Sequence, residues 1–145
     1  MEANEAKVIA SRVHAGQLSR AGEPLIDHVQ RVAEAVPAEG RALAYLHDVL
    51  ERVEHPGEQL STLALNPHES SVLALLTRRP KESYRRYVMR IARADGEAGR
   101  MARAIKLADL DDHLRQRRVP ARAPDYAWAK QMILLAQHAR GEPSP

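Results

Sequence analysis

An adjacent histidine and aspartate, His47-Asp48, are the residues of this chain whose types and spacing most clearly suggest chemistry. Apolar residues recur every three or four positions through 43–53, which predicts a helix with one buried face. Burying an imidazole and a carboxylate on such a helix is costly unless a bound partner compensates them. A divalent cation would do so, and two further segments supply ligands for it, His28 and Asp109.

These four side chains offer two imidazole nitrogens and two carboxylate oxygens, a donor set that suits Mn²⁺, Zn²⁺ or Fe²⁺. An ion with open coordination positions can hold a water molecule and lower its pKa, so that hydroxide forms near neutral pH. Glu51 follows Asp48 by three residues, so on the predicted helix it projects from nearly the same face. It could orient that water or accept its proton.

The same residues also have purely structural explanations. A single histidine in an apolar helix is more often a hydrogen-bonded core residue than a ligand, and Asp109 could instead pair with Lys106 or Arg115. The remaining histidines show no ligand spacing, and most of them are expected at the surface or in helix caps: His14, His55, His68, His113 and His138.

The composition predicts one all-α domain. The chain has 145 residues, 44% apolar and 28% charged, which is typical of a globular protein. Phe is absent, and Trp and Tyr contribute only one and four residues, so an aliphatic core is expected, which favours packed helices over sheets. The domain is expected to span 1–140, followed by a loose tail at 141–145.

Helical periodicity, broken by Pro and Gly, predicts helices throughout and no strand. Asn66-Pro67, with Glu69 three residues after the asparagine, predicts a capping box at one helix start. The expected helices lie at about 2–15, 24–36, 38–53, 58–65, 66–77, 84–91, 97–117 and 125–140.

Several features bear on location. The absence of cysteine excludes disulfides and thiolate ligands and suits a reducing compartment. The N-terminus lacks the basic start and apolar run of a signal peptide. No segment approaches the ~20 apolar residues that span a bilayer. We therefore expect a cytoplasmic protein without membrane contacts.

Four segments, in this order, resemble the motifs of HD-domain phosphohydrolases of the RelA/SpoT type, which remove the 3′-pyrophosphate of (p)ppGpp. They are HAGQ at 14–17 with GEPLIDH at 22–28, AYLHDVLE at 44–51, LLTR at 75–78 with SY at 83–84, and KLADL at 106–110 with HLR at 113–115. Together they cover about residues 10–118, and their order and spacing are far more specific than any one of them.

The resemblance implies an HD-domain helical bundle with a metal site between helices, most often occupied by manganese. It implies hydrolysis of a phosphorylated nucleotide, in which a metal-activated water attacks phosphorus and pyrophosphate leaves. Glu51 matches the first of the family's two catalytic acids, and Arg52 takes the place of the second. The implied metal ligands are His28, His47, Asp48 and Asp109.

Other positions that face substrate in the family differ here. His113 replaces an asparagine, and in the loop before Pro24 only Arg20 is placed to reach a nucleotide. Lys106 and Arg115 match positions near the site and could neutralise phosphate charge, although a solvated helix face explains them equally well.

Three functions follow from these observations. The first is a metal-dependent phosphohydrolase, with (p)ppGpp and then NADPH as the substrates to test. The second is a degenerate HD-domain protein that binds a nucleotide or protein partner without efficient hydrolysis, as Arg52 suggests. The third, a nucleic-acid binder, is motivated by a sequence pI of about 9.5 and the basic run at 115–118. It is disfavoured because the chain shows no compact helix-turn-helix pattern.

Overall fold

The computed structural model describes residues 1–54, 56–115 and 123–143. Within these residues the chain is all-helical and contains no strand, as the composition predicts. The elements are α1 Ala3–Val13, α2 Leu25–Ala35, a short 3₁₀ helix η1 Ala38–Gly40, α3 Arg41–Leu46, α4 Pro56–Thr62, α5 Pro67–Leu76, α6 Tyr84–Arg93, α7 Gly96–Leu114 and α8 Ala123–Ala139.

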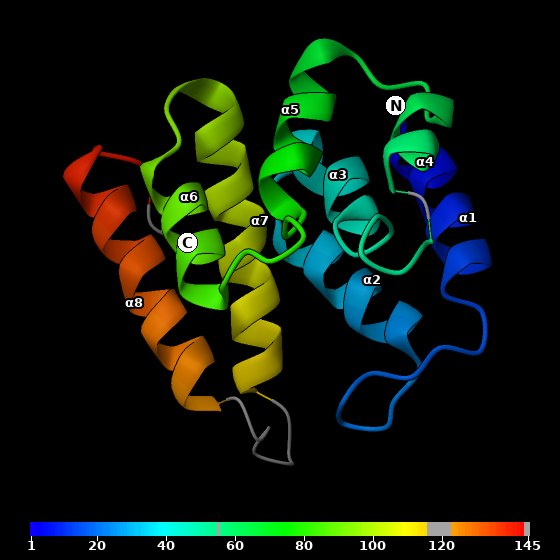
Figure 1. Ribbon diagram of the computed structural model, residues 1–145, viewed down its shortest axis with the longest axis horizontal. Helices are drawn as coiled ribbons and strands as arrows, with labels where there is room; N and C mark the ends of the chain where they lie inside the picture. The colour runs from blue at the N-terminus through cyan, green and yellow to red at the C-terminus, as the bar shows by residue number, and fades with distance from the viewer. Residues whose placement is uncertain (55, 116–122, 144–145) are drawn as a thin grey trace.

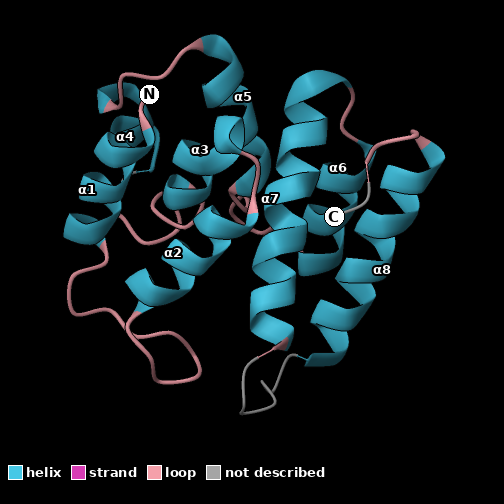
Figure 2. Ribbon diagram, turned by 180° about the vertical axis from the view of Figure 1, so that it is seen from behind, coloured by secondary structure: helices cyan, strands magenta, loops and turns pink. Residues whose placement is uncertain are grey.

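The long helix α7 organises the bundle. It packs against α2 and α5 on one side and against α6 and α8 on the other, while α3 packs against α1 and α2. Figure 1 shows α6 and α8 on one flank of α7 and α1–α4 on the other, and the view from behind gives the same arrangement (Figure 2). Among the described helices, none combines the length and apolar content that crossing a bilayer requires.

The core is aliphatic and lies on the faces that periodicity predicts. The stripe of α2, from Leu25 through Val29 and Val32 to Ala33, is buried, and Val36 just beyond the helix is buried as well. The capping box that opens α5 is also present, since Asn66 and Glu69 exchange backbone and side-chain hydrogen bonds.

One helix ends earlier than expected. The segment predicted as a single helix over 38–53 is η1 followed by α3, and His47 and Asp48 lie in the turn after Leu46. In a continuing helix the carbonyl of Ala44 would accept from the Asp48 amide. It accepts instead from His47, whose imidazole Nδ1 lies 2.6 Å and whose backbone amide lies 3.4 Å from the oxygen. The backbone then continues with a hydrogen bond from the Val49 amide to the Leu46 carbonyl. Glu51 is therefore not one helical turn beyond Asp48.

The C-terminal tail is also more fixed than expected. Arg103 on α7 is 1% exposed, and its guanidinium donates to the carbonyl of Ala94 and to the carboxylate of Glu142, with Nε to Oε2 at 3.0 Å. A buried guanidinium needs such a counter-charge. Glu142 is therefore anchored to the bundle, while 144–145 of the expected tail lie outside the described residues.

The Arg103–Glu142 pair generates a stability prediction. Glu142→Gln leaves a buried cation without its counter-charge, so the free energy of unfolding should fall by about 3 kcal/mol in a denaturant titration. The matched control is Glu97→Gln, because Glu97 pairs with Arg100 at the surface, where the side chains are 73% and 43% exposed. That change should stay below about 1 kcal/mol. Equal losses in the two variants would contradict the assigned role of Glu142.

Candidate metal centre

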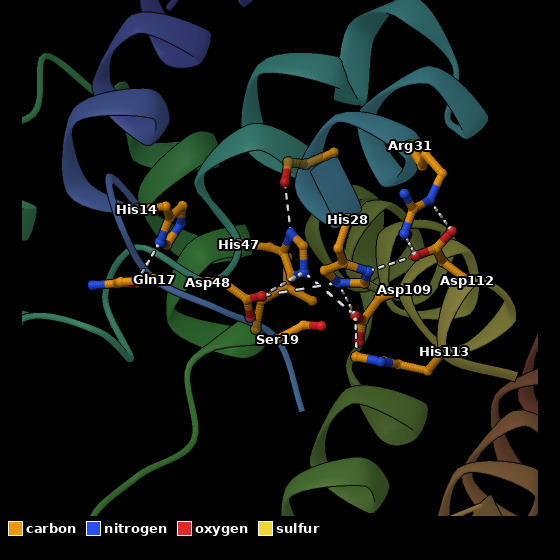
Figure 3. A network of polar contacts seen from close by, with 12 residues as sticks. His14, Gln17, Ser19, His28, Arg31, His47, Asp48, Asp109, Asp112 and His113 are labelled. Atoms are coloured by element: carbon orange, nitrogen blue, oxygen red, sulfur yellow. Dashed lines mark hydrogen bonds and ion pairs between the residues drawn. The ribbon is translucent and has the colours of Figure 1, made fainter. Parts of the chain in front are cut away.

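Three segments distant in sequence bring the four predicted ligands together. His28 comes from α2, His47 and Asp48 from the turn after α3, and Asp109 from α7. The Nε2 atom of His28 lies 3.0 Å from Asp109 Oδ1 and 3.9 Å from Asp48 Oδ2, and His47 Nε2 lies 3.5 Å from both of these oxygens. Figure 3 shows the two imidazoles and the two carboxylates converging.

The far side of the His28 ring is held by Asp112. Its Oδ2 lies 2.7 Å from His28 Nδ1, and its Oδ1 accepts from Arg31 Nε, also at 2.7 Å. Although burial favours the neutral acid, the hydrogen bonds from His28 and Arg31 hold the pKa of Asp112 well below its usual range. An ionised carboxylate only accepts, so His28 Nδ1 carries a proton, and in the neutral ring Nε2 presents a lone pair.

His47 is oriented in the same way by the backbone. Its Nδ1 lies 2.6 Å from the carbonyl oxygen of Ala44, which can only accept, so Nδ1 again carries the proton. Its Nε2 atom is buried and has no hydrogen-bond partner. A buried polar atom without a partner is costly, and this one faces Asp48 and Asp109. Outer partners that fix the tautomer in this way are typical of metal-ligating histidines.

The electrostatics of the cluster favour a cation. The lone pairs of two neutral imidazoles would face two carboxylates, an arrangement that needs positive charge between them. Burial alone would lower the pKa of His28, but hydrogen bonds to Asp109 and Asp112 outweigh it and raise that pKa to about 10. The pKa of His47 is also raised, because Asp48 and Asp109 outweigh its burial. A divalent ion would supply the same positive charge beside the carboxylates as these bound protons do.

The separations between histidine and aspartate atoms suit a bound divalent ion. Ligand atoms about 2.1 Å from a metal lie about 3 Å apart when adjacent and about 4 Å apart when opposite. The measured separations of 3.0 to 3.9 Å lie within this range. Two overlapping groups of donors that share His28 could hold a metal, His28 with His47 and Asp48, and His28 with Asp109 and His113. Their nitrogen and oxygen donors suit Mn²⁺, Fe²⁺ or Zn²⁺.

Lys106 belongs to the same cluster. It is buried, and its Nζ donates to Asp109 Oδ2 at 2.8 Å. Pairing with Lys106 was one of the alternatives that the sequence analysis gave for Asp109. The ammonium also lies over the rings of Tyr84 and Tyr87, at 5.9 and 5.2 Å. Burial opposes its charge, but Asp109 outweighs burial and raises the pKa of Lys106 well above its usual value. This pair leaves Oδ1 of Asp109 facing the histidines.

The predicted catalytic residues lie on an exposed segment. Glu51 and Arg52 are exposed in the turn beyond Asp48, and Glu51 Oε1 accepts from the backbone amide of Arg78 at 3.0 Å. Arg20 is exposed in the loop between α1 and α2. Glu51 therefore ties the turn to the segment after α5.

Arg115 lies on the side of Asp112 that faces away from the predicted ligands and lines a groove there. It is exposed at the C-terminal end of α7, and the groove, of about 1140 Å³, is also lined by Arg31 and Asp112. Among the described residues, none of the four predicted ligands lines this groove. The rest of the basic run, 116–118, lies outside the described residues, as does His55.

Two residues of the cluster were not predicted as part of it. Asp112 follows Asp109 by three positions, and this helical spacing was a signal that could have been used. His113, expected to contact substrate, has its Nε2 atom 3.1 Å from Asp109 Oδ1.

His14 also differs from expectation. It was predicted at the surface or in a cap, but it is only 1% exposed, with Nδ1 3.0 Å from Gln17 Oε1. Burial lowers its pKa.

No family model matches the chain, and no curated protein matches it significantly. Membership of the HD superfamily therefore stays a prediction from the four motifs.

The ligand set predicts the metal content of purified protein. His47→Ala removes a nitrogen donor and should abolish most of the metal that copurifies or rebinds, measured by elemental analysis. His138→Ala is the matched control, since His138 is exposed on α8. Equal metal contents in the two variants would count against the site.

The outer shell predicts a second effect. Asp112→Asn weakens the hold on His28 Nδ1, so metal affinity measured by calorimetry should fall about 10–100-fold. Asp111→Asn is the control, because the neighbouring Asp111 pairs with Lys130 at 2.7 Å and contacts no predicted ligand among the described residues. An unchanged affinity for the Asp112 variant would show that this carboxylate does not support the metal site.

Proposed function

We propose that the protein is a metal-dependent phosphohydrolase of the HD type that acts on a phosphorylated nucleotide. One observation carries the metal site: both imidazoles, His28 and His47, commit their Nδ1 protons outside the cluster and direct Nε2 at a pair of carboxylates. The order of the four HD-like motifs supports hydrolysis as the chemistry.

A divalent metal bound by these side chains would supply Lewis acidity and a water molecule of lowered pKa. The protein's own residues would do the rest. Lys106 restrains Asp109, and Asp112 and Ala44 restrain the two imidazoles. In the hydrolysis, the water oxygen bonds to phosphorus and the bond from that phosphorus to the ribose oxygen breaks. The ribose oxygen is the leaving group and becomes a hydroxyl, and the attacked phosphorus departs with the water oxygen as phosphate or pyrophosphate. We assign Glu51 as the acceptor of the water's proton.

Exposure indicates the side from which substrate approaches. Asp48 is 21% exposed, whereas the side chains of His28, His47 and Asp109 are between 0 and 5% exposed. The open side of the cluster is therefore that of Asp48. Arg20, in the loop between α1 and α2, and Arg52, in the turn after Asp48, are exposed cations, and guanidinium groups suit phosphate.

Turnover of a nucleotide panel tests the proposal. The full chain loaded with Mn²⁺ should release pyrophosphate from (p)ppGpp or phosphate from NADPH, detected by chromatography of nucleotide products. Asp109→Asn should reduce turnover by at least about 100-fold, since it weakens the metal site, and His138→Asn should not. If the metal-loaded protein hydrolyses no nucleotide while a known HD hydrolase does so in parallel, the phosphohydrolase assignment is wrong.

A second function is favoured by two observations. Arg52 stands where the resembling family has an acid, and one oxygen of Glu51 is already bonded to the Arg78 amide. These features suit a protein that binds a nucleotide or a protein partner without efficient hydrolysis. Arg52→Asp discriminates between the two functions. A large gain in turnover would show that the wild type has lost an activity, as the second function requires. If the wild type is active and the variant turns over substrate at the same rate, the second function is excluded.

A further inference from the structure

A third imidazole reaches the same carboxylate oxygen as the first two. His113 Nε2 lies 3.1 Å from Asp109 Oδ1, the atom that is also 3.0 Å from His28 Nε2 and 3.5 Å from His47 Nε2. The ligand atoms of His28, Asp109 and His113 lie within 4.8 Å of one another, as do those of His28, His47 and Asp48. His28 thus belongs to both groups.

The His113 ring is held in place by stacking. One face lies against His28, with ring centroids 4.5 Å apart and planes at 28°, and the ring also stacks with Tyr126 at 4.8 Å and 18°. Its side chain is 22% exposed. The stacked ring points towards Asp109, as Figure 3 shows.

Hydrogen bonding leaves one of the three nitrogens without a partner. Oδ1 of Asp109 lies 3.0 Å from His28 Nε2 and 3.1 Å from His113 Nε2, which its two lone pairs can satisfy, whereas His47 Nε2, 3.5 Å away, is buried and has no hydrogen-bond partner. Two of them, on His28 and His47, carry lone pairs in the neutral rings because their protons reside on Nδ1. Several lone pairs that face one small space are the arrangement that a metal ion requires.

We propose that His113 is a third imidazole ligand of the metal, which would make the donor set three nitrogens and two oxygens. This inference rests on the metal site of the proposed function and deepens it. Replacing the asparagine of the resembling motif by histidine exchanges an amide for a nitrogen donor. Because imidazole suits zinc, iron and copper better than manganese, a third imidazole should raise the affinity of the site for these ions relative to manganese.

The competing explanation is that His113 donates an Nε2–H hydrogen bond to Asp109 and never touches the metal. In that case it would position the aspartate, and its loss would leave the number of coordinated imidazoles unchanged. Counting the imidazoles bound to a paramagnetic ion separates the two roles without relying on enzyme activity.

The experiment uses the full chain loaded with one equivalent of Cu²⁺ and pulsed electron paramagnetic resonance, which counts coordinated imidazoles. Three are expected in the wild type and in the surface control His138→Asn, and two in His113→Asn and His113→Gln. Calorimetry with Zn²⁺ and Mn²⁺ should show a loss of zinc affinity of at least about tenfold in the His113 variants and a smaller loss for manganese.

The outcomes separate the two proposals. Metal binding with two imidazoles in the wild type and in the His113 variants would overturn the role of His113 and leave the metal site of the proposed function standing. A wild type that binds none of the three ions would overturn that metal site itself. Thermal melts of the metal-free variants verify that each is folded, and the Gln variant provides a second test if the Asn variant is unstable.

Discussion

The site depends on two hydrogen bonds that point away from it. Nδ1 of His28 is bound by Asp112, and Nδ1 of His47 is bound by the carbonyl of Ala44. Each bond keeps a proton on Nδ1, so in its neutral form each ring turns an Nε2 lone pair towards Asp48 and Asp109. Without these outer acceptors the rings could adopt the other tautomer and donate to the carboxylates, and the cluster would be an ordinary buried hydrogen-bond network.

The helices are arranged so that these bonds can form. Asp112 and Asp109 share a face of α7, and α2 packs against that face, so one helix supplies both an inner and an outer partner to His28. Because α3 ends at Leu46, the carbonyl of Ala44 has no partner one helical turn later and accepts from the amide and the imidazole of His47. The early end of this helix is thus part of the construction of the site.

Charge balance explains the residues around the cluster. Three aspartates lie close together, and this would be unfavourable without cations beside them. Lys106 neutralises the outer oxygen of Asp109, and Arg31 pairs with Asp112 on the far side of His28. The negative charges that remain, on Asp48 and on Oδ1 of Asp109, face the histidines, where a divalent ion would neutralise them. Lys106 is therefore better described as a support of the ligand than as part of a solvated helix face.

The sequence alone determined the all-helical class, the buried stripes and the capping box at Asn66, because these depend on neighbours within one or two helical turns. It also identified the four residues of the cluster, since their types and order are local motifs. The structure brings all four together. Glu51, Arg52 and Arg20 remain predictions.

Only the tertiary structure decided the end of α3, the burial of His14, the anchoring of Glu142 by Arg103, and the places of Asp112 and His113 beside the ligands. Each of these depends on a contact between a side chain and a group that local periodicity does not specify. Asp112 shows the difference well: its spacing from Asp109 was visible, but that it meets His28, 84 positions away, follows only from the packing of α2 against α7.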